Sequence, residues 1–509
     1  MTGAESLAQT LLANGVDVCF ANPGTSEMHF VAALDRFPGI RCVLGLQENV
    51  VTGAADGYWR MAERPAATLL HCGPGLANGL ANLHNARRAQ SGIVNIVGDQ
   101  ATHHRALDAP LTADTDGWAR GVSAWTRTAT GATTVGRDAA AAVEVARQGQ
   151  IATLIVPADI AWNQEGSIGQ ALSLPRAPKP TQHAIGNAER VLRSGQPTLL
   201  LLGGATLRGT ALADAYRIAL RTGARIMAQT HNARIERGCG RPSVARVPYR
   251  VDQALAELAP FQHLLLVGAT PPVSFIAYPG KPGHLYPPEC ELHVLARPDE
   301  DGPFALEQLA DALGAPRVPP ADAGLDRAVP QGAPLTAFAK TIAALLPPNA
   351  VVVNEAGTCG PAIYAASHDS APHDWLDLTG GAIGAGLPMA VGAAIAAPGR
   401  RVLSLQADGS GMYTVQALWT QARERLAVTT VVFSNRTYAI LLAELAHVGA
   451  QAGPTARNMM TLSDPDIGWV RLATGLGVEA ARADGCEQLA DLLRTSFRSS
   501  RPFLIEFCW

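Results

Sequence analysis

Short apolar runs alternate with helix-like segments along most of the chain. In the first third, the runs rich in Val, Ile, Leu and Ala are residues 16–21, 41–46, 66–71, 93–97 and 151–156. Helical patterns over residues 5–14, 27–37 and 50–61 separate the early runs. Apolar strands separated by helices are typical of a parallel sheet that helices cover on both faces. The pattern therefore predicts an α/β fold.

Two proline-rich stretches, residues 173–180 and 316–334, divide the chain into three units of this kind. Strand-like runs resume after them at residues 198–202, 225–229, 263–267 and 292–295, and then at 350–354, 402–406, 429–433 and 503–507. A chain of 509 residues also exceeds the ~250–300 residues that one core supports. We predict three doubly wound parallel-sheet domains, at residues 1–165, 181–316 and 335–509.

The composition excludes several classes of protein. Hydrophobic residues make up 48% of the chain and charged residues 16%, which is typical of a folded globular protein. The formal net charge of −3 provides no basic surface, so we expect neither nucleic acid nor a membrane as a partner. The 8 cysteines are scattered without a CxxC motif, and the first residues lack a secretory signal pattern. These features favour reduced thiols and a cytoplasmic location.

One uncharged segment, residues 378–399, is long enough to resemble a membrane span. It consists largely of Gly, Ala and Pro with few large apolar side chains, and Arg400 and Arg401 follow it directly. We therefore predict a glycine-rich loop that enters a tightly packed helix.

The strongest chemical signal lies at the ends of two predicted strands in the last third. Asp408-Gly409-Ser410 follows one strand, and Asn435 follows the next, 27 residues later. Carboxyl ends of parallel strands meet at one edge of a sheet, where ligands of open α/β sheets bind. A carboxylate, an amide oxygen and the carbonyl of Thr437 are hard ligands that suit Mg²⁺. We predict a metal and phosphate site here, with Gly409 and Ser410 at the phosphate.

Several motifs occur in the order and at the spacings of one enzyme family. They are Asn22-Pro23-Gly24-Thr25, Gln47-Glu48-Asn49, Ala54-Ala55-Asp56-Gly57-Tyr58, Leu70-His71, Asn354-Glu355, residues 380–388, Asp408-Gly409-Ser410 and Asn435-Arg436-Thr437-Tyr438. Over essentially its whole length the chain resembles the thiamine diphosphate (ThDP)-dependent 2-oxo acid decarboxylases and acetolactate synthases, and most of all the benzoylformate decarboxylases. The resemblance implies a pyrimidine-binding, a central and a diphosphate-binding domain, with ThDP and Mg²⁺ as cofactors. It also implies a homodimer or homotetramer with active sites between subunits.

The resemblance assigns a role to several residues. Glu48 matches the catalytic glutamate that bonds the pyrimidine ring of ThDP, and nearby apolar residues would shield it from water. Ile383 matches the residue that wedges the two rings together, and Gly381 would offer its carbonyl to the 4′-amine. The residues expected to bind the cofactor are Asn22, Pro23, Gly24, Gly357, Thr358, Gly381, Ile383, Gly409, Ser410 and Tyr438.

The candidates for substrate contacts match different members of the family. By resemblance, His71 and Thr25 are candidate catalytic residues, and His71 could bond a substrate carboxylate or transfer a proton. A histidine that is buried and satisfied remains the alternative for His71. His103 and His104 resemble the paired histidines of pyruvate decarboxylases within a poorer local match.

Several departures from the family pattern bear on the substrate. Residues 272–280 contain no histidine where benzoylformate decarboxylase supplies its second one, which argues against benzoylformate. Ile440 replaces a smaller pocket residue, and Glu444 stands where an aromatic would pack, so a small or polar substrate is favoured. The sequence shown ends directly after its last predicted strand, and we expect an open site or one covered by residues 445–465.

The sequence therefore predicts a ThDP- and Mg²⁺-dependent enzyme that decarboxylates a 2-oxo acid. The enamine that remains after loss of CO₂ would then take a proton. In carboligation it would instead attack an aldehyde or a second 2-oxo acid as the acceptor. A carboligase of the acetolactate synthase type is the first alternative, and a non-catalytic family member is the second. FAD is not expected, because Gly203-Gly204-Ala205 lacks a full GxGxxG fingerprint.

Overall fold

The computed structural model describes residues 1–172, 177–319 and 334–508, so parts of both proline-rich stretches lie outside the described residues. The first sheet has the strand order β2-β1-β3-β4-β6-β5 and is parallel throughout. Its strands are β1 (Val18–Asn22), β2 (Arg41–Leu44), β3 (Ala66–Leu70), β4 (Ile93–Asp99), β5 (Trp125–Thr128) and β6 (Ile151–Pro157). The sequence predicted all of these strands except β5.

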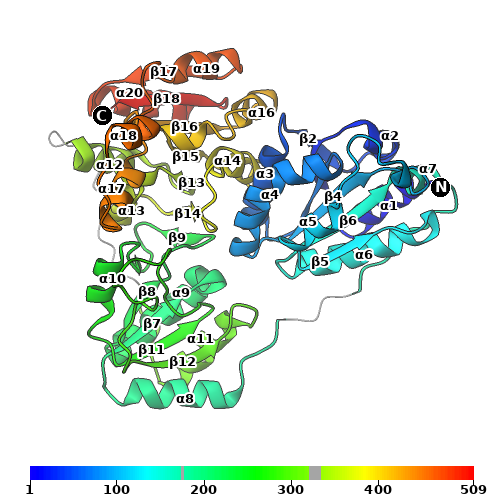
Figure 1. Cartoon of the computed structure of the whole chain (residues 1–509). Helices are drawn as coiled ribbons and strands as arrows, with labels where there is room; N and C mark the ends of the chain where they lie inside the picture. The colour runs from blue at the N-terminus through cyan, green and yellow to red at the C-terminus, as the bar shows by residue number, and fades with distance from the viewer. Residues whose placement is uncertain (173–176, 320–333, 509) are drawn as a thin grey trace.

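Helices cover both faces of this first sheet, as the alternation of apolar side chains along its strands requires (Figure 1). Val18 and Phe20 of β1 belong to one core cluster, and Cys19 and Ala21 belong to another on the opposite face. The helices are α1 (Gly3–Ala13), α2 (Met28–Arg36), α3 (Glu48–Ala62), α4 (Cys72–Ala89), α5 (Thr115–Arg120), α6 (Ala132–Arg147) and α7 (Ala158–Trp162).

The central sheet is also parallel, with the order β10-β8-β7-β11-β12. Its strands are β7 (Thr198–Leu202), β8 (Arg225–Ala228), β10 (Ala245–Arg246), β11 (His263–Val267) and β12 (Glu291–Ala296). Its helices are α8 (Gln182–Arg193), α9 (Gly209–Thr222), α10 (Val251–Leu258) and α11 (Gly302–Ala312). The strand β7 is fully buried, as its run of four leucines predicts.

The last sheet has seven strands in the order β17-β18-β16-β15-β13-β14-β9. These strands are β13 (Ala350–Glu355), β14 (His373–Asp377), β15 (Val402–Ala407), β16 (Val428–Ser434), β17 (Glu479–Ala483), β18 (Phe503–Cys508) and β9 (Ile235–Arg237). The helices are α12 (Pro334–Leu345), α13 (Gly360–Ala366), α14 (Gly386–Ala396), α15 (Asp408–Gly411), α16 (Ala417–Arg423), α17 (Ala439–His447), α18 (Pro454–Met460), α19 (Trp469–Gly475) and α20 (Cys486–Arg498). The predicted α/β class with three parallel-rich sheets is confirmed.

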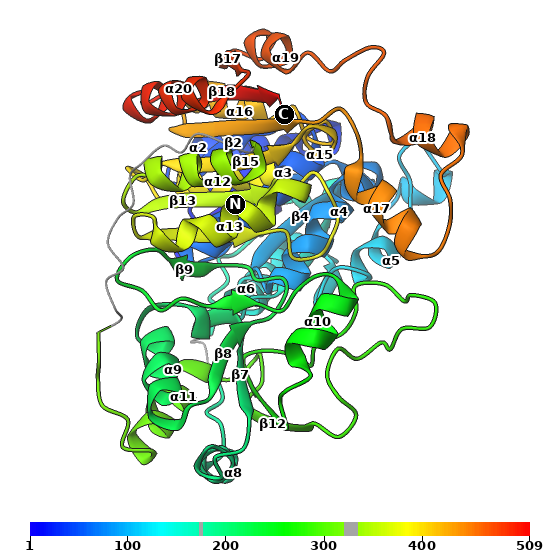
Figure 2. The same cartoon turned by 90° about the vertical axis from the view of Figure 1, so that its left-hand side faces the viewer.

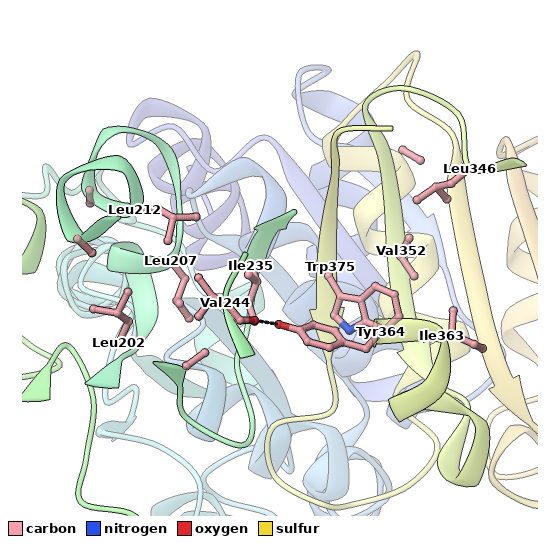
Figure 3. Close-up of a cluster of buried hydrophobic side chains, with 14 of the residues drawn as sticks. Leu202, Leu207, Leu212, Ile235, Val244, Leu346, Val352, Ile363, Tyr364 and Trp375 are labelled. Carbon is pink, nitrogen blue, oxygen red and sulfur yellow. Dashed lines mark hydrogen bonds between the residues drawn. The ribbon is translucent and has the colours of Figure 1, made fainter. Parts of the chain in front are cut away.

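The strand β9 departs from the simple division into three units. It belongs in sequence to the middle of the chain, yet it pairs antiparallel with β14 of the last sheet. Beside this pairing, Tyr364 packs edge-on against Trp375, and its hydroxyl donates to the carbonyl of Val244 at 3.0 Å (Figure 3). The central and last sheets therefore share one continuous buried cluster.

The first and last sheets meet where α3 crosses α14 (Figure 1). The two helices approach closely at this crossing. A Cβ on Gly57 would lie 2.1 Å from the carbonyl oxygen of Met389, so the position requires glycine. The helix α14 follows a glycine-rich loop, so the prediction for residues 378–399 is confirmed. Among the residues that the structure describes, no helix is both long and apolar enough to cross a membrane.

Gly392→Ala should lower the thermal unfolding midpoint by several degrees, because the new Cβ would lie 1.8 Å from the carbonyl oxygen of Ala54 in a packed helix crossing. Overpacking of this kind costs about 1–3 kcal/mol or more. The matched control is Gly186→Ala in α8, where a Cβ meets no heavy atom within 4 Å. Calorimetry on both variants should show a loss for the first only, and equal midpoints would contradict this account of the crossing.

Candidate active site

Asp408 and Asn435 lie side by side at the carboxyl edge of the last sheet. Asp408 directly follows β15, and Asn435 directly follows β16. The two strands are parallel neighbours, and Ala407 pairs with Phe433 at their ends. Both residues therefore lie at the same edge of the sheet, the edge at which open α/β sheets bind ligands.

The Asp408 carboxylate is buried among backbone amides. It is 3% exposed, and it accepts the N–H of Gly409 at 2.8 Å and the N–H of Arg436 at 2.7 Å. Burial raises its pKa, while those amides act in the opposite direction. The guanidinium of Arg436 pairs instead with Asp466 at 3.2 Å. A buried carboxylate without a cationic side-chain partner among the described residues fits a site for a bound cation.

The loop after β16 is held in place by the segment around α18. The Asn435 amide oxygen accepts the Thr437 N–H at 3.1 Å, and the Thr437 hydroxyl donates to the carbonyl of Met460 at 2.9 Å. Tyr438 bonds the same carbonyl through its N–H at 2.8 Å. The segment 445–465 therefore contacts the predicted metal loop, and Figure 2 shows α17 and α18 together at this side of the last sheet.

Glycines make room for close packing beside Asp408. A Cβ on Gly409 would lie 2.4 Å from Cε1 of Tyr438, so the ring lies directly on the backbone. The Ser410 hydroxyl accepts from Gln406 at 2.6 Å. The exposed Gly357 and Thr358 follow β13, and Gly357 has a φ of +54°, a conformation that favours glycine.

Glu355 anchors the glycine-rich loop from beneath. Its buried carboxylate accepts the backbone N–H groups of Gly384 and Gly386 at 2.7 Å each, and burial raises its pKa. The loop thereby presents Gly381, with a φ of +79°, and the half-buried Ile383. The sequence motif contained Glu355, but only the structure gives it this anchoring role.

Asparagines of α4, in the first unit of the chain, hold the same loop. Asn85 donates to the carbonyl of Ala382 at 2.7 Å, and Asn82 donates to the carbonyl of Gly384 at 3.2 Å. The amide oxygen of Asn85 also accepts the N–H of Ala382 at 3.2 Å. The loop is therefore fixed by side chains from both the first and the last unit of the chain.

Glu48 is the first residue of α3 and is 6% exposed. One carboxylate oxygen accepts from the Asn78 side chain at 3.0 Å, and the other lies 3.0 Å from the position of a Cβ on Gly75. The nearby Val50 and Ala54 are fully buried. The structure thus places Glu48 in a shielded position, and Asn78 is a partner that sequence reasoning missed.

A cavity of about 310 Å³ opens beside the end of β1 and the start of α4. Four of the predicted substrate and catalytic residues line it, namely Thr25, His71, His103 and His104. Cys72, Gln100 and Trp162 complete much of the wall. The described residues that line it all come from the first unit, so within one chain this cavity is separate from the Asp408 loop.

His71 is held at this cavity by a buried carboxylate. The Glu27 carboxylate lies 2.9 Å from Nδ1 of His71 and also accepts the Gly24 N–H at 2.8 Å. The Ser26 hydroxyl donates to Glu27 at 2.6 Å and approaches the thiol of Cys72 at 2.9 Å. Burial raises the pKa of Cys72 to about 11, so the thiol stays protonated near neutral pH. Glu27 is a functional candidate that the sequence analysis did not single out.

The predicted pocket residues Ile440 and Glu444 lie on α17. Cδ1 of Ile440 packs near Gly357, 3.5 Å from where a Cβ would be. The Glu444 carboxylate accepts from the hydroxyl of Tyr278 at 2.7 Å, and burial followed by this bond raises the pKa of Tyr278. The Glu444 carboxylate is thus already engaged by a residue of the segment 272–280.

The same segment also reaches the glycine-rich loop. A Cβ on Gly381 would lie 2.6 Å from Cζ of Phe275, and Phe275 packs against Tyr249 and His231. The segment 272–280, which lacks the second histidine, therefore presents Phe275 to Gly381 and Tyr278 to Glu444. No motif in the sequence marks this contact, because its partners are far apart in the chain.

Comparison with known proteins identifies the class that this fold and site define. Residues 1–119 match the model "Thiamine pyrophosphate enzyme, N-terminal TPP binding domain", and residues 355–507 match "Thiamine pyrophosphate enzyme, C-terminal TPP binding domain". The chain belongs to the thiamine pyrophosphate (ThDP)-dependent enzymes, as its motifs predicted.

Among its relatives, "Putative acetolactate synthase large subunit IlvX" of Mycobacterium tuberculosis is 50% identical over 99% of this chain and 98% of that protein. "Benzoylformate decarboxylase" of Pseudomonas aeruginosa is 29% identical over 98% and 97%. The solved ThDP-dependent 4-hydroxybenzoylformate decarboxylase of Rhodococcus jostii is similar at a TM-score of 0.86 and 25% identity, covering 99% of this chain and 98% of that one.

Proposed function

We propose that this enzyme decarboxylates a 2-oxo acid with ThDP and Mg²⁺ and releases the product as a free aldehyde. The observation that carries the proposal is His71 on the cavity wall, whose Nδ1 lies 2.9 Å from the buried carboxylate of Glu27. Release of an aldehyde needs a proton donor beside the reacting carbon. Carboligation instead needs a second carbonyl compound there, which accepts the reacting carbon. A histidine oriented by a buried carboxylate is suited to that proton transfer.

The residues at the edge of the last sheet fit the cofactor. Asp408, Asn435 and the carbonyl of Thr437 would hold Mg²⁺, since they offer hard oxygen ligands around a buried negative charge. Gly381 and Ile383 would position the coenzyme rings, and Glu48 would bond the pyrimidine. When bound, ThDP supplies the nucleophilic carbon and accepts the electrons that decarboxylation leaves behind.

The chain's own residues would position the substrate and manage the proton. Because the Glu27 carboxylate accepts from Nδ1 of His71, Nε2 is the ring nitrogen left to exchange a proton with a ligand. Thr25 lines the same cavity and offers a hydroxyl to a substrate carboxylate. The apolar neighbours of Glu48 would exclude water from its charge.

We also propose that the active site forms between two subunits of a homodimer or homotetramer. The cavity with His71 is lined by described residues of the first unit, while Asp408 lies in the last unit. A partner chain would supply the second half of each site. Sedimentation at increasing protein concentration tests this, and a fully active monomer would contradict it.

Product analysis tests the proposed reaction. The purified protein with ThDP and Mg²⁺ is incubated with a panel of aliphatic and aromatic 2-oxo acids, with and without an aldehyde acceptor. Equal amounts of CO₂ and free aldehyde are expected. CO₂ with coupled product only, even without added acceptor, would overturn the decarboxylase proposal.

His71→Gln should reduce free aldehyde formation by roughly 10²–10⁴-fold, the usual contribution of a positioned proton donor. Coupled product with an added aldehyde should fall less, because there the proton goes to the oxygen of the acceptor and not to the reacting carbon. The control is His183→Gln, an exposed histidine on α8 that does not line the cavity. Equal losses of both products in the His71 variant would argue for a purely structural histidine.

An acetolactate-synthase type of carboligase is the second candidate. The 50% identity with the mycobacterial protein of that name favours it. In this case, two molecules of a small 2-oxo acid would give one CO₂ and one acetohydroxy acid. The same product analysis distinguishes the two candidates.

A further inference from the structure

Two histidines and a glutamate meet at the amino edge of the central sheet, away from the candidate active site. His263 is the first residue of β11, and Glu291 is the first residue of β12. The parallel strands pair His263 with Glu291, and His293 follows two residues later on β12. Because side chains alternate along a strand, all three project from the same face.

The ligand atoms of these residues are spaced as a metal would require. Nδ1 of His263 lies 3.1 Å from Nε2 of His293, and one Glu291 carboxylate oxygen lies 3.7 Å and 3.6 Å from the two nitrogens. A tetrahedral zinc site with bonds of about 2.0–2.1 Å separates its ligand atoms by about 3.3–3.4 Å. We propose that His263, Glu291 and His293 bind a divalent cation of the zinc type, with water in the fourth position.

The burial of the two imidazoles suits this role. His263 is 9% exposed, while the Glu291 side chain is 67% exposed and gives the site an opening to solvent. Burial first, and then the nearby His263, holds the pKa of His293 below its ordinary value. The neutral imidazole is the form that binds metal. Two nitrogens and one carboxylate oxygen favour Zn²⁺, Co²⁺ or Ni²⁺ over Mg²⁺, which prefers oxygen ligands.

Neighbouring amides orient the two rings. The Gln196 amide oxygen lies 2.5 Å from Nε2 of His263, so this nitrogen carries the proton and Nδ1 keeps its lone pair for a ligand. The Asn187 amide lies 3.2 Å from Nδ1 of His293. Rotation of that amide by half a turn lets its oxygen accept from Nδ1–H when Nε2 binds the metal. The rotation releases Arg190, which is an exposed side chain.

The alternative for this cluster is a hydrogen bond between the two histidines, with Glu291 solvated. The ring centroids lie 5.1 Å apart, which fits two imidazoles on one tetrahedral ion, about 5.2 Å apart at ordinary bond lengths. A bound ion would link β11 to the edge strand β12, through Asn187 to the middle of α8, and through Gln196 to the loop after that helix. Its expected role is to stabilise the central unit.

Metal binding to the full-length enzyme tests the proposal. The enzyme is first saturated with ThDP and Mg²⁺, then equilibrated with Zn²⁺ or Co²⁺ alone, and the bound metal is measured after dialysis. The wild type should bind one equivalent more than His293→Gln or His263→Gln, and Glu291→Gln should bind at least tenfold more weakly. His368→Gln, another histidine beside a carboxylate, should match the wild type, because within the described part of the chain its ring pairs with one carboxylate only, that of Asp369 at 3.7 Å.

A second cluster of potential ligands, Glu27, His71 and Cys72, must be separated from this site. Co²⁺ at Cys72 would show a sulfur charge-transfer band that Cys72→Ser removes, whereas the proposed site contains no sulfur. Zn²⁺ should also raise the thermal midpoint of the wild type more than that of Glu291→Gln, whose exposed side chain leaves folding intact. Equal metal content and equal thermal shifts in the wild type and in Glu291→Gln, His263→Gln and His293→Gln would overturn the proposal.

Discussion

Glu48→Gln should keep its fold and bind ThDP while its turnover falls by roughly 10²–10⁴-fold. Glutamine has the size of glutamate, and its oxygen can still accept from Asn78, which lies 3.0 Å from the carboxylate. It cannot carry the negative charge that the proposed bond to the pyrimidine ring needs. Steady-state turnover measures the loss, and exchange of the coenzyme's C2 proton, followed by NMR, shows whether activation is the step affected.

The same charge change at the far end of the helix provides the control. Glu63 follows α3, and its side chain is 56% exposed and pairs with Arg208. Exposed ion pairs contribute only about 0–1 kcal/mol, so Glu63→Gln should leave turnover and proton exchange near the wild-type values. Wild-type exchange rates in Glu48→Gln would remove Glu48 from the proposed activation step.

Strands with apolar sequences could be predicted, and strands with polar sequences could not. The strand β14 reads His-Asp-Trp-Leu-Asp, yet all five residues are buried. Asp374 is compensated by Arg234 and Arg400, and Asp377 accepts from Asn354 at 2.8 Å. These partners come from distant parts of the sequence. The local pattern therefore shows a polar segment, although tertiary contacts make it a buried strand between β13 and β9.

The two outer strands β5 and β17 were missed for a related reason. Each lies at an edge of its sheet, and several of its residues remain partly exposed. Edge strands need no continuous apolar run, since one side faces solvent. The strand β9 adds the further difficulty that it pairs with a sheet from another part of the chain.

In the candidate site, too, some residues could be predicted from the sequence and others could not. Asp408 and Asn435 could be placed together because each follows a predicted strand, and parallel strands bring their ends to one edge. Glu27 was not singled out, because a glutamate at the start of a helix is common for electrostatic reasons alone. Its burial at 4% and its bond to His71 distinguish it, and both depend on the fold. The Tyr278–Glu444 bond likewise joins residues 166 positions apart.

Asp408→Asn should weaken the binding of Mg²⁺ and ThDP by at least ~100-fold, since loss of even an indirect partner of a metal ligand costs 10–100-fold. At a cofactor concentration 100 times the wild-type Kd, binding stabilises the wild type by about 2.7 kcal/mol. The variant would gain only about 0.4 kcal/mol at that concentration. Thermal unfolding with and without Mg²⁺ and ThDP measures the difference directly.

The matched control for that variant is Asp466→Asn in the same region. Asp466 pairs with the side chain of Arg436, and both side chains are about half exposed, so its charge is already screened by water. If Asp408 binds the metal, only its variant should lose the cofactor-dependent shift in the unfolding midpoint. If the two variants lose the shift equally, the general negative charge of the loop attracts the cation, and the direct ligand role of Asp408 is wrong. We expect only the Asp408 variant to lose the shift. Two backbone amides fix the orientation of the Asp408 carboxylate, and its burial keeps water from screening the charge.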